Sequence, residues 1–285
     1  MSLKEILGSG NLLATHFEFT NDPTEFRYGQ TLVVDATRKT LNGLHQDNWA
    51  APVLTSVLRK IETEGLHDDV PTFVACFSAD EDNLGQWRAY ADDGRGYALG
   101  FDTTKWDYKK PNDSRCGTVL VKCLYDVQAM AKEIGELHEL ILKEGALRKR
   151  LAQDPAQQAL VLFDVEKALF LVGAFACLRL KHAGFQDERE WRLVALPNES
   201  NDEGPDCECV RVADGRFAPA MPLRLSPPDH ALPFRRLVMG PYHAQEEGRS
   251  KIAAYGLRQL LKLKGHDVSK PGFIRNSQIP YRSRR

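Results

Sequence analysis

The sequence predicts a single α+β domain spanning residues 1–285, with a mixed, bent and antiparallel-rich sheet, flanking helices and a helical insertion at about 126–184. Two short apolar runs, FVACFS at Phe73–Ser78 and YALGFD at Tyr97–Asp102, alternate small and large residues and indicate strands. Long helical patterns fill the proposed insertion, and a strand leads into a helix near the C-terminus. Together these three observations predict the fold class.

Composition excludes several classes of protein. Of the 285 residues, 42% are hydrophobic and 27% charged, and the formal net charge of −1 does not favour nucleic acid or a membrane surface. No apolar run reaches the roughly 18–20 residues that cross a bilayer, and we see no signal peptide. Cysteines such as Cys76, Cys123 and Cys177 lie in apolar segments, which indicates reduced core residues in a cytoplasmic protein. Cys207 and Cys209 lack a second pair, so we expect no metal site.

The N-terminal part is expected to form a short helix and a strand within residues 1–15. Asn21-Asp22-Pro23 predicts a turn, because Asn and Asp bond back to the backbone and Pro fixes φ. Glu25 follows, either as an acid that stabilises a helix N-terminus or, with Asp22, as part of a pocket lining. Another helix is predicted over residues 46–64 from its apolar spacing.

The connector between the two apolar runs predicts a short helix. Ser78 and Asp80 are suitable caps, and Trp87 and Tyr90 stand at helical spacing before a glycine turn. Two interpretations are open: the aromatic residues belong to the core, or the polar rim around them is part of a ligand pocket. That rim contains Ser78, Asp82, Asn83 and Arg88.

The insertion is expected to contain two helices. Asp126 caps the first, and Asp154-Pro155 starts a second that reaches about His182 and closes at Gly184. The middle of the second helix is apolar nearly all round, so we expect it to be buried. We interpret His138 and His182 as surface or capping residues.

A strand over residues 185–196 would place Glu188, Glu190 and Arg192 on one face. Two like charges on one face are unfavourable unless Arg192 or a bound cation-like group offsets them. The face is therefore either solvated, with cross-strand ion pairs, or it presents a catalytic carboxylate with a second one beside it.

The C-terminal third begins with an acidic loop region, residues 198–230, that includes one strand pair through Val210–Val212. A strand at 232–240 and a helix at 244–264 meet at Gly240-Pro241, a type of junction whose backbone N–H groups can hold an anion, although Gly-Pro alone is a weak signal for one.

From Arg235 to the end, 12 Lys or Arg face 3 Asp or Glu, which is +9 locally and leaves −10 for the rest. This basic region, which includes Arg275 and Arg282, is either a solvated face or a site for the phosphates of a nucleotide or nucleic acid.

Four ordered motifs resemble the signature of a bacterial family of domains of unknown function that are often found near phage-defence genes. The resemblance runs from about residue 10 to the C-terminus. Family members have a strand with a His-Tyr-Thr element before the first motif, and this sequence starts too late to hold it. The motifs are N-D-P-x-E at 21–25, S-x-x-x-D-N-L-x-x-W-x-x-Y at 78–90, E-x-E-W-R at 188–192 and S-x-I-P-Y-R at 277–282, with Met239-Gly240-Pro241 before the last.

A more distant, fold-level resemblance to ADP-ribosyltransferases implies an enzyme that uses NAD as substrate, with no metal, in defence or toxicity. By this resemblance Glu190 is the catalytic carboxylate and Glu188 lies beside it, while Trp87 or Tyr90 stacks on the nicotinamide. The other expected ligand-binding residues are Ser78, Asp82, Asp22, Glu25, Arg192, Arg275, Ser277 and Arg282.

Two alternatives to an enzyme stay open. The chain is a non-catalytic module that binds a nucleotide or a partner protein, which the missing His-Tyr-Thr element favours, or it binds nucleic acid through the basic C-terminal region. The partner is expected to be a protein or a nucleic acid and not a membrane.

Overall fold

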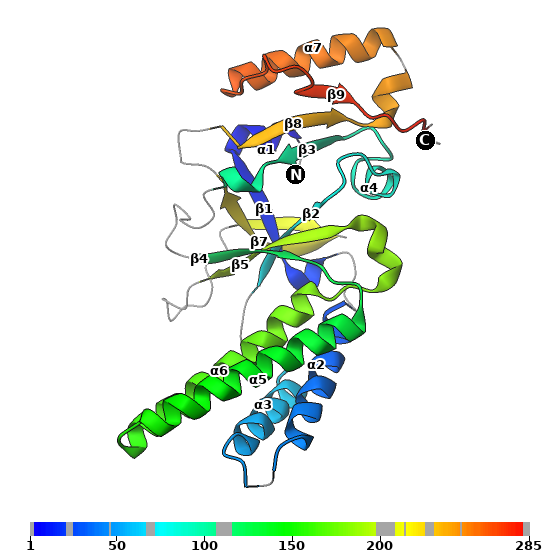
Figure 1. The fold of residues 1–285 in the computed structure, drawn as a ribbon. Coiled ribbons are helices and arrows are strands. Elements are labelled where there is room, and N and C mark those ends of the chain that lie inside the picture. Colours follow the sequence, from blue (N-terminus) through cyan, green and yellow to red (C-terminus); the bar gives the residue numbers. More distant parts are fainter. Residues whose placement is uncertain are drawn as a thin grey trace. The chain divides into compact units, whose positions relative to one another are not determined.

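The computed structural model describes most of the chain, and these residues form two compact units (Figure 1). Unit 1 contains Met1–His16, Phe73–Leu120 and Asp187–Arg285, and unit 2 contains Phe17–Thr72 and Val121–Gln186. The second segment of unit 2 holds the predicted helical insertion; that both units form one domain stays a prediction. The described residues are 3–20, 25–45, 47–66, 72–106, 116–197, 209–213, 215–225, 231–245 and 247–281.

Unit 1 is built on two sheets, and the predicted α+β class is confirmed. The larger sheet has the order β4-β5-β2-β1-β7-β6, and the smaller has the order β3-β8-β9. In the smaller sheet β3 is antiparallel to β8, and β8 is parallel to β9. The strands are β1 Asn11–His16, β2 Phe73–Ser78, β3 Tyr97–Phe101, β4 Cys116–Lys122, β5 Glu190–Pro197, β6 Cys209–Ala213, β7 Arg216–Arg224, β8 Phe234–Met239 and β9 Ile274–Asn276.

The two apolar runs that predicted the fold do form strands, but they lie in different sheets. β2 pairs with β1 and β5, whereas β3 pairs with β8. The connector between them holds helix α4, Leu84–Tyr90, as predicted. Its N-cap is Asn83, whose side chain accepts from the Gln86 N–H at 3.2 Å, and not Ser78 or Asp80. The cap therefore lies one residue before the helix, where its side-chain oxygen reaches the first free N–H groups.

A single apolar core joins both sheets of unit 1 with two helices, α1 (Leu3–Ser9) and α7 (Glu247–Leu263). Leu193 and Leu237, one from each sheet, are fully buried, as is Leu261 of α7. Burial of each such side chain contributes about 1.5–3 kcal/mol, so this core fixes the strand ends that carry the polar motifs.

Unit 2 is helical, and it contains α2 (Glu25–Asn42), α3 (Ala51–Thr63), α5 (Val127–Leu151) and α6 (Pro155–Arg179) (Figure 1). The predicted starts of α5 and α6 are correct. Asp126 accepts from the Gln128 N–H at 2.8 Å, and Asp154 accepts from the Gln157 N–H at 2.9 Å. The end of α6 was predicted too late, because Leu180 turns into an extended conformation and forms a β-bridge with Leu124. Helix α2 begins at Glu25, where a helix N-terminus was one of the two interpretations, but its extent was not predicted.

The helices of unit 2 approach one another closely at glycines. A Cβ on Gly29 of α2 would lie 2.7 Å from the Cα of Cys177 on α6, and one on Gly173 would lie 2.9 Å from a methyl of Val33. Burial raises the pKa of the Cys177 thiol, which keeps it in the unreactive protonated form.

The expectation that His138 is a surface or capping residue is wrong, since its side chain is fully buried on α5. Its Nδ1 lies 3.1 Å from the hydroxyl of Thr40 on α2. Within the described part of the chain, its Nε2 is buried without a hydrogen-bond partner. Burial lowers the pKa of His138 to about 4, so the ring is neutral at pH 7.

Four short 3₁₀ helices complete the described elements. None of the described helices combines the length and apolar character that crossing a membrane requires. Cys123 and Cys177 are buried, as predicted, whereas Cys76 is exposed. The short helices are η1 Phe17–Phe19, η2 Thr103–Lys105, η3 Ala183–Glu188 and η4 Pro241–Gln245.

Candidate functional site

The structure brings two of the sequence motifs together at one end of the β2–β5 pair. The two strands are antiparallel, and Ser78, the last residue of β2, is paired with Glu190, the first of β5. Two positions further in, Cys76 is paired with Arg192. Strand pairing therefore places the residues that follow β2 beside those that precede β5.

Glu190 and Arg192 form a buried ion pair on one face of β5. Each residue is 5% exposed. The Arg192 Nε donates to Glu190 Oε1 at 2.9 Å, and Nη2 donates to Oε2 at 3.3 Å. A bidentate pair of this kind holds both groups charged in a place where either one alone would be costly to bury.

Glu188 does not share that face, contrary to the prediction. Strand β5 begins at Glu190, and Glu188 is the last residue of η3. Between them Arg189 has φ +45°, a left-handed conformation that a non-glycine residue adopts at a cost. Two interactions hold it there: its carbonyl accepts from the Ala79 N–H at 3.0 Å, and its guanidinium is 2.5 Å from Asp80.

The turn at Arg189 directs the half-buried Glu188 toward helix α4. The hydroxyl of Tyr90 lies 3.4 Å from Glu188 Oε1, and Tyr90 is 53% exposed. The Ser78 hydroxyl donates to the Glu188 carbonyl at 2.8 Å, and Asn83 Nδ2 donates to the Asp187 carbonyl at 3.1 Å. Glu188 is thus held from its backbone, while its carboxylate lies beside a solvent-exposed phenol.

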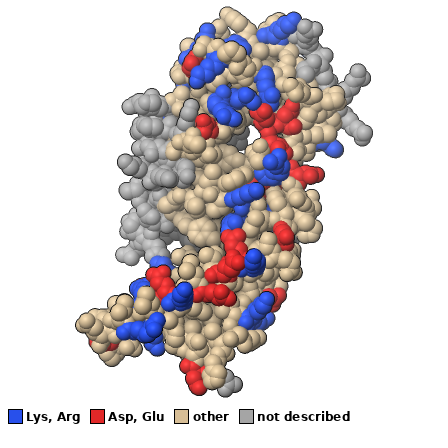
Figure 2. All heavy atoms as spheres, viewed as in Figure 1, with Lys and Arg blue, Asp and Glu red and all other residues tan. Residues whose placement is uncertain are grey.

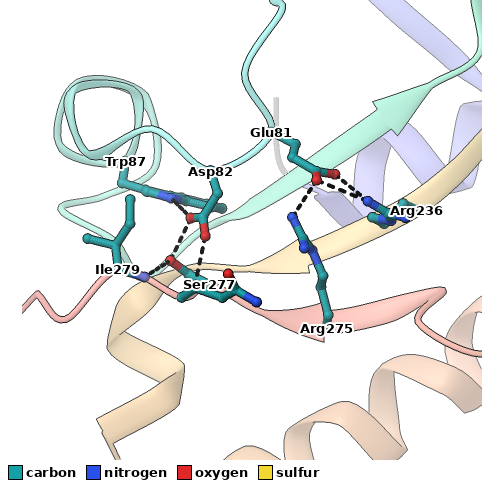
Figure 3. A network of polar contacts seen from close by, with 8 residues as sticks. Glu81, Asp82, Trp87, Arg236, Arg275, Ser277 and Ile279 are labelled. Atoms are coloured by element: carbon teal, nitrogen blue, oxygen red, sulfur yellow. Dashed lines mark hydrogen bonds and ion pairs between the residues drawn. The ribbon is translucent and has the colours of Figure 1, made fainter.

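Asp82 is the centre of a second polar network (Figure 3). Its Oδ1 accepts from Trp87 Nε1 at 2.7 Å and from the Ser277 hydroxyl at 2.6 Å, and its Oδ2 accepts from the Gln278 N–H at 2.8 Å. The same hydroxyl accepts from the Ile279 N–H at 3.1 Å. The C-terminal segment is therefore tied to the loop before α4.

These contacts change the character of Asp82 and Trp87. Burial by itself would raise the pKa of Asp82, but hydrogen bonds from Ser277, Gln278 and Trp87 and the charge of Arg275 outweigh it and lower that pKa. The Trp87 side chain is 3% exposed, as expected for a core residue. Both side chains are thus occupied by internal contacts.

Glu81, which the sequence did not single out, lies beside this network and bridges two arginines (Figure 3). The Arg275 Nη2 is 2.6 Å from Glu81 Oε1, and the Arg236 Nη1 is 3.0 and 2.8 Å from the two carboxylate oxygens. Sequence alone offers one signal for this cluster, the basic residues of two C-terminal strands.

The glycine junction at Gly240-Pro241 does not offer free N–H groups for an anion. Its N–H groups are occupied, because Gly240 donates to the Gly96 carbonyl at 3.0 Å and Tyr242 to the Gly94 carbonyl at 3.1 Å. The junction instead joins the turn before β3 to the end of β8.

The described residues do not include all of the predicted site. Asp22 and Arg282 lie outside them, as does the side chain of Glu25, which is the first residue of α2 in unit 2.

Within the ranges that the structure describes, no group of His, Cys, Asp or Glu has the arrangement of a metal site. Over the described residues on the face shown in Figure 2, Lys and Arg side chains are intermixed with Asp and Glu.

Residues 86–193 match the model of a family described as a protein of unknown function, DUF2971. This DUF2971 match contains Trp87, Tyr90 and the Glu188–Arg192 segment. The predicted resemblance to a family of unknown function is thereby supported for this part of the chain. No curated protein and no solved structure matched.

Proposed function

We propose that the protein breaks the glycosidic bond of NAD and transfers ADP-ribose, with Glu188 as the carboxylate at the reacting centre. The observation that carries the proposal is a half-buried carboxylate beside an exposed tyrosine, with 3.4 Å between Tyr90 Oη and Glu188 Oε1. The fold-level resemblance to ADP-ribosyltransferases supplies the class of reaction by analogy.

In this reaction the bond between the nicotinamide nitrogen and ribose C1′ breaks, and its electron pair leaves with nicotinamide. The positive charge that develops on the ribose is stabilised by a nearby carboxylate. A nucleophile on the acceptor, or water, then bonds to C1′, and its proton passes to the carboxylate. We assign both tasks to Glu188 and assign the stacking of the nicotinamide to Tyr90.

The role of Glu190 in this proposal is to position Glu188. From the sequence Glu190 was the favoured catalytic residue, but its side chain is 6% exposed and both oxygens accept from Arg192. Glu188, at the end of η3, is more accessible. The Glu190–Arg192 pair would then fix the start of β5 next to it.

A second candidate is a module that binds a nucleotide or a partner protein without turnover. The observation that favours it is that Glu190, Asp82 and Trp87 are all occupied by internal contacts. A nucleic-acid interface stays a prediction, and Figure 2 does not favour it, since charges of both signs are intermixed there.

The test is nicotinamide release from NAD, with a bacterial lysate as acceptor, by the parent protein and matched variants. We expect Glu188→Gln to lower the rate by about 100-fold or more and Tyr90→Phe to lower it less. Asp187→Asn, an isosteric change one residue away, is the control and should leave the rate unchanged.

Thermal unfolding of each variant separates loss of chemistry from loss of fold. A rate that falls in Glu190→Gln but not in Glu188→Gln, with both folded, would return the catalytic role to Glu190. If the folded parent protein releases no nicotinamide with any acceptor, the proposed enzyme is contradicted and the binding module becomes the favoured function.

A further inference from the structure

We propose that Arg236 and Arg275 form a binding site for phosphate groups, and that the carboxylate of Glu81 occupies this site in the free protein. The ligand would be the diphosphate portion of a nucleotide. The identity of the ligand rests on the proposed function, whereas the anion site itself rests on the geometry of the three side chains.

The two arginines reach the same face of the smaller sheet. Strands β8 and β9 are parallel neighbours, with Val238 paired to Arg275. Arg236 is two residues before Val238, so its side chain lies on the same face as that of Arg275. On the other side of β8, Gly100 of β3 is paired with Arg236, and a glycine leaves space above the sheet at that position.

Glu81 engages only some of the donors of the two arginines. Each guanidinium carries five N–H groups. Among the residues that the structure describes, Arg236 bonds only through Nη1 and Arg275 only through Nη2, and both bond to Glu81. The Nε of Arg275 is buried with no partner there. A phosphate group offers more acceptor oxygens than one carboxylate and matches the fork of an arginine.

Glu81 is also able to leave. It is in the five-residue loop 79–83 between β2 and α4, and its side chain is 44% exposed. Exposed ion pairs contribute only about 0.2–1 kcal/mol each, so an incoming anion competes with a weak contact. The neighbouring Asp82 accepts hydrogen bonds from three other donors, and its interaction with Arg275 is one of charge only.

The position of Glu81 connects this site to the proposed reacting centre. Glu81 follows Ser78 by three residues, so their Cα atoms are at most about 11 Å apart. Ser78 donates to the backbone of Glu188. A dinucleotide spans such a distance, with its diphosphate on the arginines and its reactive ribose at Glu188.

The experiment is isothermal titration calorimetry of the full chain with inorganic pyrophosphate and with ADP, at low ionic strength. We expect the parent protein to bind both. Glu81→Gln removes the competing charge with little change in shape, and should tighten binding about three- to tenfold. The Arg236→Gln/Arg275→Gln double variant should abolish binding of both ligands.

The matched control is Arg235→Gln, which removes the same charge from the preceding, exposed position of β8 and should change affinity less than about twofold. If the double variant does not fold, Arg236→Lys and Arg275→Lys keep the charge and lose the planar fork. In them binding should weaken at least about threefold.

Three results would overturn the proposal. They are no binding of pyrophosphate or ADP by either the parent or Glu81→Gln, no tightening in Glu81→Gln, and equal weakening in the Arg235→Gln control. The outcome separates from that of the proposed function. If the protein binds ADP but releases no nicotinamide, the anion site is supported and the proposed enzyme is contradicted. If nicotinamide release is unaffected by the arginine variants, the enzyme is supported and the anion site is contradicted.

Discussion

The helices of unit 2 and the β2–α4 loop of unit 1 are held by different kinds of interaction. Between α2 and α6 the contacts are apolar and close, with the backbone of Cys177 filling the space over Gly29. Around the loop the contacts are polar, and Asp82 and Glu81 each serve two or more donors. Close packing of this kind stabilises one arrangement, whereas polar pairs of this kind set positions and contribute little net stability.

This difference indicates which part of the molecule is the better candidate for a binding site. Unit 2 also buries polar side chains, among them the ring of His138, whereas in unit 1 the polar contacts gather around Ser78, Asp82 and Glu188. Strain at Arg189 lies in the same part of unit 1. Strained and polar positions of this kind cluster at binding sites because packing alone does not require them.

The largest effect is expected where a charge is buried in unit 1. Arg192→Met removes the charge that neutralises the buried carboxylate of Glu190 and should lower the free energy of unfolding by about 3–5 kcal/mol. The double variant Glu190→Leu/Arg192→Met should recover at least half of that loss, because no charge is left unpaired. Chemical denaturation measures the stability of both variants. If the double variant is no more stable than Arg192→Met, the ion pair stabilises the fold by more than the neutralisation of two buried charges.

The next effect is the pH dependence that His138 gives to unit 2. Its pKa is about 4 when folded and 6.5 ordinarily, so between these values the unfolded chain binds a proton that the folded one does not. Stability should therefore fall by about 3 kcal/mol as pH drops from 6.5 to 4. His138→Leu should remove that slope and His45→Gln, an exposed control, should keep it; identical slopes in all three would contradict the assignment.

The smallest expected effect is the change in stability on substituting each of two glycines of unit 2. Gly29→Ala would press a methyl against the Cys177 backbone and should destabilise by about 1–3 kcal/mol. Gly135 on α5 has no atom within 4 Å of the added methyl, so Gly135→Ala should stabilise by about 0.5–1 kcal/mol through helix propensity. Thermal unfolding compares them, and equal shifts would mean that close packing is not what holds α2 to α6.

Local signals predicted the N-caps of α5 and α6, whereas elements that depend on long-range packing were not predicted. Asp126 and Asp154 cap their helices through hydrogen bonds to residues two or three positions away. The extent of helix α2 was missed because β-branched residues such as Thr31 and Val33 weaken its intrinsic helix preference, and its buried face forms only against other helices.

The candidate site was predicted in part for the same reason. Ser78 and Glu188 were identified, but alternation implied a strand through Glu188, and nothing local indicated the left-handed turn at Arg189. The bridge from Glu81 to Arg236 and Arg275 joins positions more than 150 residues apart along the chain, beyond the reach of any spacing rule.

The contact between Asp82 and Ser277 also determines when, during synthesis, the loop before α4 can reach its final arrangement. The two residues are separated by 195 positions, which a ribosome covers in roughly 10–40 s at about 5–20 residues per second. During that interval the loop before α4 exists without the segment that ties it. The loop region can therefore reach its final arrangement only after the segment around Ser277 has been made.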